Sequence, residues 1–81
     1  MGVDISGKDL SHKDLTGADL EGANLSQADL KFAKLKDADL NKANLTGADL
    51  TGAKIKNTRN LDSAIKCKTI FSWGEDNSGC K

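Results

Sequence analysis

The sequence predicts an all-β solenoid in which the chain winds as a square coil of parallel strands, and two observations predict it. A Leu or Ile recurs at every fifth residue from Ile5 to Ile55. In each block from Ala18 to Ala53, an Ala stands two residues before that aliphatic residue. An internal repeat this regular decides the architecture before the propensities of single residues do.

The period of five fits neither a helix nor a flat strand. Five residues turn an α-helix by about 500°, so successive Leu residues would step about 140° around the axis and form no face. Because five is odd, they would alternate between the two faces of a strand. They converge only if the chain turns a corner in every block, so that four corners close a coil of about 20 residues. Stacked coils then pair as parallel strands about 4.8 Å apart.

The residue types suit such a coil. The Leu fills the interior, and the small Ala points inward where a larger group would collide with its neighbours. The chain has no Pro, which suits a backbone whose N–H groups are needed for ladders. Gly, which favours tight turns, falls at the predicted corners. These corner residues are Gly7, Gly17, Gly22, Gly47 and Gly52.

The predicted organisation is a single domain over residues 1–81. About three and a half coils over residues 3–65 would be followed by a C-terminal cap over 66–81, with Phe71 and Trp73 lying over the last coil. Residues one coil apart should stack. The predicted core columns are Ile5/Leu25/Leu45/Ile65, Leu10/Leu30/Leu50/Ile70, Leu15/Leu35/Ile55 and Leu20/Leu40/Asn60.

The repeated motif resembles that of the pentapeptide repeat family. It runs from Ala18-Asp19-Leu20-Glu21-Gly22 through Ala48-Asp49-Leu50-Thr51-Gly52, and the likeness is strong over residues 3–57 and looser over 58–70. The resemblance implies a right-handed quadrilateral β-helix. It implies no single function, because members of the family do many different things.

The tail carries a second, looser resemblance. Cys67-Lys68-Thr69 and Asn77-Ser78-Gly79-Cys80 are similar to a C-terminal extension in some pentapeptide repeat proteins of cyanobacteria and chloroplasts. We expect Cys67 and Cys80 to form a disulfide, which would close a loop of about 14 residues and add about 3 kcal/mol in the chain-entropy model. Free thiols or a redox pair are the alternatives. A disulfide favours an oxidising compartment (thylakoid lumen, periplasm or cell exterior), and free thiols favour the cytoplasm.

Composition excludes several functions. Twelve Lys and Arg balance 12 Asp and Glu, so the chain lacks the basic excess of a general nucleic-acid binder. No run of 18 apolar residues exists, so we expect no transmembrane helix and no membrane partner. The start of the sequence does not resemble a signal peptide. With one His and no Gly-rich phosphate loop, we predict no enzyme, no cofactor and no catalytic residue, and we interpret His12 as a structural or surface residue.

The outward faces of the coil differ in charge. A two-by-two grid of lysines surrounds the Leu15/Leu35/Ile55 column, and it is a candidate surface for an anionic partner. The alternative is a solvated face relieved by Asp37. Phe32, at a corner position, is a further candidate contact, although it could equally be a local packing residue. The grid consists of Lys34, Lys36, Lys54 and Lys56.

A ladder of aspartates, Asp9, Asp29 and Asp49, stands on another face. Oxygen ligands of this kind could hold a divalent cation. The simpler interpretation is a solvated stripe imposed by the repeat, so we predict no metal site. At the start of the chain, Lys8 and Lys13 stand where later blocks have Ala. Such lysines protect an edge, or else a second chain completes this end, so we expect a monomer or an end-to-end homodimer through the N-terminal coil.

These observations favour a structural or protein-binding scaffold whose partner the sequence does not reveal. The alternative is DNA mimicry, because some pentapeptide repeat proteins resemble B-form DNA and bind DNA gyrase, a type II topoisomerase. This chain departs from that pattern in its zero net charge and its lysine grid. A third hypothesis, suggested by the tail, is a regulatory or stress-linked lumenal protein of a photosynthetic organism.

Overall fold

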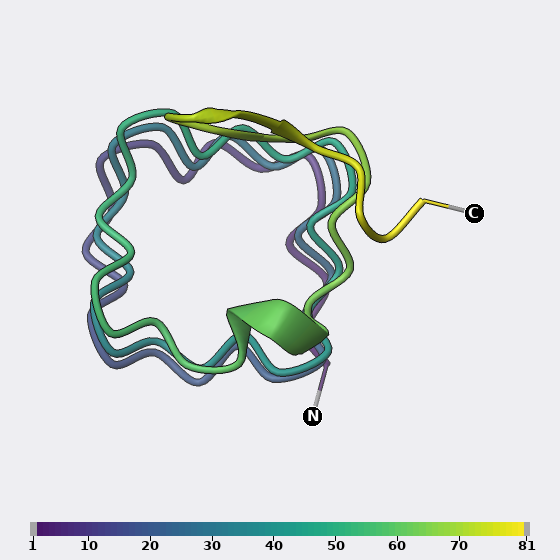
Figure 1. Ribbon diagram of the computed structural model, residues 1–81. Coiled ribbons are helices and arrows are strands. Elements are labelled where there is room, and N and C mark those ends of the chain that lie inside the picture. Colours follow the sequence, from purple (N-terminus) through teal and green to yellow (C-terminus); the bar gives the residue numbers. More distant parts are fainter. Residues whose placement is uncertain (1, 81) are drawn as a thin grey trace.

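A computed structural model describes residues 2–80, whose chain winds around the four sides of a square (Figure 1). Parallel bridges join residues that are 20 apart, from Asp4 with Asn24 to Asp39 with Arg59. Seen with its C-terminal end toward the reader, the chain runs counterclockwise as it comes forward, so the coil is right-handed (Figure 1). The predicted right-handed quadrilateral parallel β-helix is confirmed.

Each side of the square is a short parallel ladder. Asn24 N–H donates to the Val3 carbonyl at 2.7 Å, and Leu25 N–H donates to the Asn44 carbonyl at 2.8 Å. One residue therefore donates to the preceding coil, and the next residue donates to the following coil. This alternation satisfies the backbone of a middle coil without any long strand.

Each corner is a tight turn closed by a main-chain hydrogen bond. Ala18 N–H, for example, donates to the Leu15 carbonyl at 3.0 Å. The third residue of the turn has a positive φ, which is 71° at Gly17 and 61° at Phe32. A positive φ at this place is typical of a type II turn and favours Gly. The Gly positions predicted the corners, and non-glycine residues occupy others at a conformational cost.

The interior consists of the repeating Leu and Ala side chains. Six Leu residues from Leu25 to Leu50 and six Ala residues from Ala23 to Ala48 are at most 1% exposed. Full burial of one Leu contributes about 1.5–3 kcal/mol. Leu10 in the first coil is only half-buried, because a coil packs against it on one face alone.

The predicted stacking of Ile65 and Ile70 in the core columns is wrong. The ladder gains one residue after Arg59, so Ile65 pairs with Asn44 and Ile70 pairs with Asp49. A slip of one residue exchanges the two faces of a strand. Ile65 therefore points outward and is 44% exposed.

The shifted register has a reason in the sequence. Leu61, Lys66 and Phe71 keep the spacing of five, and Ala64 and Thr69 take the positions that Ala holds in earlier coils. Phe71 is 3% exposed, Ala64 is 7% exposed, and Thr69 is fully buried. The new register places the Phe71 ring inside the coil, above Leu50. The unshifted register would leave that ring outside.

Asn60 begins this shift and does not continue the Leu20/Leu40 column as predicted. It is exposed and left-handed, with φ 64°, and it precedes the 3₁₀ helix η1 (Leu61–Ser63). Leu61 packs against the core in its place. The Lys66 ammonium group then donates to the Leu61 carbonyl at 2.6 Å, which satisfies an oxygen of η1.

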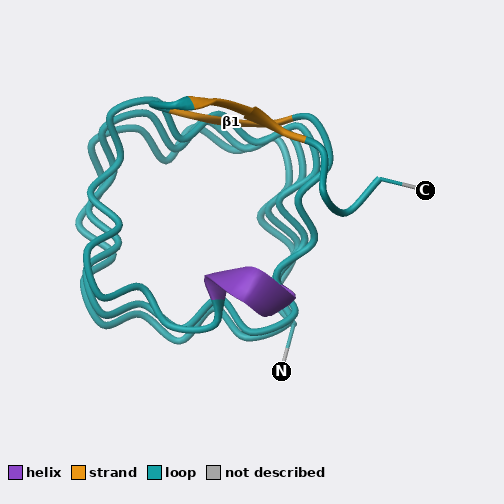
Figure 2. Ribbon diagram, in the orientation of Figure 1, coloured by secondary structure: helices purple, strands orange, loops and turns teal. Residues whose placement is uncertain are grey.

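The C-terminal cap is a hairpin of two strands, β1 (Thr69–Phe71) and β2 (Gly74–Asp76), which pair antiparallel (Figure 2). Phe71 and Trp73 stack with ring centroids 4.6 Å apart and an interplanar angle of 3°. Phe71 points into the coil, whereas Trp73 is 68% exposed. The hairpin thus closes the end of the core with one ring and covers that ring with the other.

Candidate functional site

The four grid lysines lie on one side of the square, which we call the lysine side (residues 13–16, 33–36 and 53–56). Lys34 pairs with Lys54 across adjacent coils, so the two pairs of lysines stack. This side is hollowed by about 390 Å³. The residues that line the hollow are Thr16, Lys34, Lys36, Lys54, Ile55 and Lys56.

Most turns of the coil are capped by an Asp or Asn side chain. Asp29 Oδ1, for example, accepts a hydrogen bond from Lys31 N–H at 3.1 Å. Such Asx turns satisfy an N–H group that the parallel ladder does not use. The capping residues are Asp4, Asp9, Asp14, Asp19, Asn24, Asp29, Asp39, Asn44 and Asp49.

The lysine side loses these caps after its first coil. Asp14 still caps Thr16 N–H at 3.1 Å, but Lys34 and Lys54 occupy the equivalent positions in the next two coils. Within residues 2–80, nothing accepts a hydrogen bond from Lys36 N–H or Lys56 N–H. A net hydrogen bond contributes about 0.5–1.5 kcal/mol, so each lysine replaces a stabilising contact.

The grid lysines also lack ion pairs inside the described chain. Both ion pairs found among residues 2–80 involve Lys31, whose Nζ lies 3.3 Å from Asp29 Oδ2 and 3.9 Å from Asp49 Oδ2. Asp37, which the alternative of a solvated face requires, forms no ion pair within residues 2–80 and is exposed at a corner with φ 61°. Stacked like charges repel. The lysine side is therefore a concentration of positive charge that no ion pair within residues 2–80 neutralises, and Asp14, beside Lys34, is its one carboxylate.

Phe32 lies at the corner that leads into the lysine side. Its ring stacks on His12 with centroids 5.1 Å apart, and the residue remains 51% exposed. Gly52 occupies the same corner one coil later, where an added Cβ would overlap the Phe32 ring. Phe32 therefore has a local packing role and also presents half of its surface beside the lysine side. His12 lies at the surface in this stack.

The aspartate ladder forms a column, the aspartate side, in which Asp9 pairs with Asp29 and Asp29 with Asp49. Each residue uses Oδ1 to cap its own turn, at 3.0–3.1 Å. Hydrogen bonds from the Ser11 hydroxyl and then from Ser11 N–H lower the pKa of Asp9, and Thr51 does the same for Asp49. The ladder thus functions as turn caps, which favours the solvated-stripe interpretation.

A second group of carboxylates gathers on the side of the square opposite the aspartate side. Asp19, Glu21 and Asp39 each offer an oxygen within 4.8 Å of the others. Amide groups already occupy two of them, since Asn41 donates to Glu21 at 3.1 Å and Asn60 donates to Asp39 at 2.9 Å. Sequence analysis did not single out this cluster as a site, although residues two apart and one coil apart meet in any coil of this kind.

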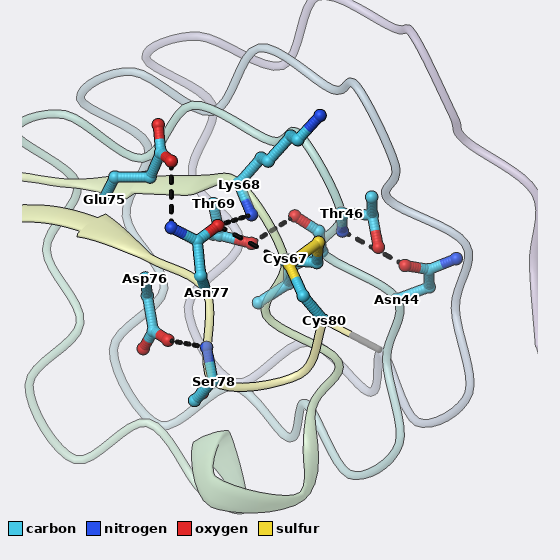
Figure 3. Close-up of a disulfide and its surroundings, with 11 residues drawn as sticks. Asn44, Thr46, Cys67, Lys68, Thr69, Glu75, Asp76, Asn77, Ser78 and Cys80 are labelled. Carbon is cyan, nitrogen blue, oxygen red and sulfur yellow. Dashed lines mark hydrogen bonds between the residues drawn. A yellow bond between two sulfur atoms is a disulfide. The ribbon is translucent and has the colours of Figure 1, made fainter.

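A disulfide joins Cys67 to Cys80 in the cap (Figure 3). Asn77 organises the loop around it, because its side-chain oxygen accepts from Lys68 N–H at 2.8 Å and its carbonyl accepts from Cys80 N–H at 3.1 Å. The tail is thereby fixed to the chain that leaves the coil. In the chain-entropy model, a loop of this length contributes about 3 kcal/mol.

The chemistry of the lysine side is that of charge recognition. Ammonium groups bind carboxylate or phosphate oxygens as point charges, and the half-buried Ile55 adds a small apolar area. The single imidazole of the chain, His12, is engaged with Phe32 at the corner. Within residues 2–80, no helix is long and apolar enough to cross a membrane.

Comparison with known families agrees with this architecture. The family model for pentapeptide repeats matches in eight copies, over residues 1–31 and 23–59. The chain therefore belongs to the pentapeptide repeat family, whose members are typically non-enzymatic structural or binding modules. The comparison with curated proteins gave no match.

Two solved structures share the fold. The pentapeptide repeat protein Rfr23 from the cyanobacterium Cyanothece 51142 is 39% identical with a TM-score of 0.67, over 75% of this chain and 48% of its own. HetL from the cyanobacterium Nostoc sp. strain PCC 7120 is 30% identical with a TM-score of 0.58, over 91% of this chain and 41% of its own. The present chain thus spans half or less of the length of each.

Proposed function

We propose that this chain is a non-enzymatic scaffold that binds an acidic protein partner through the lysine side. One observation carries the proposal. Lys34 and Lys54 replace turn-capping residues, and neither forms an ion pair within residues 2–80, although Asp14 stands beside Lys34 in the ladder. Residues that violate the local rules of a fold without an internal compensation are expected at functional sites.

The placement of Phe32 supports a contact surface. A half-exposed aromatic ring next to a cationic hollow of about 390 Å³ combines the apolar and polar elements of an interface. The family supports the class of function. HetL, one of the related structures, is described as involved in the regulation of heterocyst differentiation, and regulatory proteins commonly act by binding other molecules.

DNA mimicry toward gyrase is the weaker proposal. A mimic needs an extended negative surface, whereas this chain has zero net charge and a positive side. The compact acidic group of Asp19, Glu21 and Asp39 is the feature that supports it. A gyrase supercoiling assay tests it directly, and inhibition by the chain at low micromolar concentration would revive this proposal.

We also propose an oxidising compartment for the protein, either the thylakoid lumen, the periplasm or the cell exterior. The Cys67–Cys80 disulfide supports this location, because such bonds persist where thiols are not kept reduced. Intact mass of protein taken from its native source, with and without reductant, tests it. A gain of two hydrogens on reduction supports the oxidising compartment, and an unchanged mass supports the cytoplasm.

Light scattering on the same sample distinguishes the two proposed states, a monomer and an end-to-end homodimer through the N-terminal coil. The variants Lys8→Glu and Lys13→Glu place negative charge at that end. A homodimer built there would dissociate or change its dependence on salt.

Binding of fluorescent polyglutamate to the full chain tests the proposed function. The double variant Lys34→Gln/Lys54→Gln should bind about tenfold more weakly, because it removes one of the two stacked pairs of the grid. The matched control Lys8→Gln/Lys42→Gln removes two lysines that lie outside the lysine side and should bind as the wild type does. Equal losses in both variants, or tighter binding of duplex DNA than of polyglutamate at equal salt, would contradict the proposal.

A further inference from the structure

Later residues cover the C-terminal edge of the last coil on two sides of the square, whereas the lysine side is open. On two sides, Leu45 N–H donates to the Ile65 carbonyl at 2.9 Å and Leu50 N–H donates to the Ile70 carbonyl at 2.7 Å. On the third side, the chain leaves the coil as η1 (Figure 2). β2 then turns back along β1 before the chain reaches the lysine side again, so residues 53–57 have no following strand.

Three main-chain groups of this open edge that the ladder would bond to a following strand have no hydrogen-bond partner within residues 2–80. They are the Ala53 carbonyl, the Ile55 N–H and the Asn57 N–H. The Gly52 N–H, just before the edge, already donates a hydrogen bond to the Ser72 hydroxyl at 2.8 Å. The open edge is thus a defined stretch of five residues, which is the length of an ordinary strand.

The same groups are bonded in the preceding coil. Lys54 N–H donates to the Ala33 carbonyl at 2.9 Å, and Leu35 N–H donates to the Lys54 carbonyl at 2.8 Å. Asp37 N–H donates to the Lys56 carbonyl at 3.3 Å. A further parallel strand would therefore satisfy the open edge with the three hydrogen bonds that the coil uses one step earlier.

The inward side chains of the open edge are incompletely covered. Ala33 and Leu35 are fully buried, whereas Ala53 and Ile55, one coil later, are only partly buried. An apolar side chain placed above Ile55 would complete that burial. On the outward face, the two residues that flank this side chain would stand directly beside Lys54 and Lys56, as Lys34 stands beside Lys54.

We propose that the lysine side receives an extended acidic segment of a partner protein as an added parallel strand along residues 53–57. The segment carries an acidic, apolar, acidic pattern. Its apolar residue covers Ile55, and its acidic residues lie against Lys54 and Lys56. Recognition by strand addition takes affinity from main-chain bonds and specificity from alternate side chains. The inference rests on the proposed function and assigns its binding mode.

Edge protection alone does not account for this arrangement. Lysines on an exposed edge discourage aggregation of unpaired strands, and that role explains Lys54 and Lys56. It does not explain Lys34 and Lys36, which lie one coil inside the edge. Charge complementarity over two coils is what an acidic partner requires.

The test uses the full-length chain labelled with ¹⁵N and a heptapeptide in which glutamate and valine alternate. Amide exchange of Ile55 and Asn57 should slow about tenfold or more when the peptide binds. The N–H groups of Asp9 and Asp19, on the opposite edge of the coil, serve as the matched internal control and should not change.

Two N-methylated peptides give a matched pair of probes with the same charge. In the parallel arrangement, the glutamate residues supply the main-chain groups that meet Ala53, Ile55 and Asn57. N-methylation of the glutamates should therefore weaken binding about tenfold, whereas N-methylation of the valines should leave it unchanged.

The outcomes separate this inference from the proposed function. If the peptides bind equally well and binding still depends on Lys34 and Lys54, the added strand is wrong and the charged surface stands. If protection appears at Asp9 and Asp19, or at Ile55 without any peptide through self-association, the added acidic strand is also wrong. If no peptide binds and polyglutamate does not bind either, both proposals fail.

Discussion

The lysine side and the aspartate side share one backbone and differ in their outward side chains. Leu30 and Leu35, which lie under them in the middle coil, are both fully buried. On the aspartate side, every coil keeps its turn cap, and Lys31 lies between two carboxylates. On the lysine side, two coils lack the cap and the ion pair. Because the fold tolerates both sides, the inward column specifies it, and the outward residues are free to serve binding.

The largest expected effect tests whether the two sides are equal in their cores. Leu30→Ala and Leu35→Ala should each lower the free energy of unfolding by about 2–5 kcal/mol, because each leaves a cavity among fully buried neighbours. Urea denaturation measures both. The half-buried Leu10 and Leu15 provide matched controls, whose truncation should cost less. A Leu35→Ala variant that is nearly as stable as the wild type would mean that the lysine side is not held by the core.

The second prediction concerns the cap, which pairs with the aspartate side and not with the lysine side. Replacing Cys67 and Cys80 with Ser should lower the free energy of unfolding by about 3 kcal/mol. Amide exchange of Leu50, which donates to the cap, should accelerate more than that of Leu35, which donates within the coil. Equal acceleration at the two amides would contradict a cap that acts on one side.

The third prediction exchanges the outward residues of the lysine side. Lys34→Asn and Lys54→Asn should restore the missing caps, as Asn24 and Asn44 cap their own turns. Each variant should gain about 0.5–1.5 kcal/mol in the free energy of unfolding, and the pair should lose polyglutamate binding. A gain in stability with unchanged binding would show that the lysines serve neither the fold nor an acidic partner.

The smallest expected effect is a difference in acid stability. Hydrogen bonds from Ser11 and Thr51 lower the pKa of Asp9 and Asp49 below the usual 3.8. A carboxylate whose pKa is lower in the folded protein than in the unfolded chain stabilises the fold at pH values above the unfolded-state pKa. This stabilisation is lost as the pH falls through the folded-state pKa. The wild type should therefore lose stability below pH 3.8 more steeply than Asp9→Asn/Asp49→Asn, which keeps the caps without the titration. Thermal denaturation from pH 5 to pH 2 measures this, and parallel curves would contradict it.

Sequence reasoning predicted the fold because the spacing of five constrains every residue at once. It predicted the corners from Gly and the stacking of the grid lysines from the coil length. It failed at Asn60, because one extra residue exchanges inside for outside, and Ile65 is apolar enough to suggest the unshifted register. Leu61, Lys66 and Phe71 carried the correct register, but a Lys at an inward position concealed it.

The open edge could not be predicted from local pattern either. It depends on the direction in which β2 leaves the cap, which is a tertiary property of the last 15 or so residues. The caps of the turns were closer to hand, because Asp or Asn before the corner is a recognised turn signal. Their absence at Lys34 and Lys54 became informative only when the bonded turns were available for comparison.

Lys66 makes the C-terminal end of the solenoid unfavourable for the addition of further coils. It takes the place of the next Leu in a core column, and its ammonium group is committed to the Leu61 carbonyl. A further complete coil on this end would bury the Lys66 charge and break its hydrogen bond to Leu61. Both changes would cost free energy. We therefore expect Lys66 to disfavour head-to-tail stacking of another copy of this module on this end.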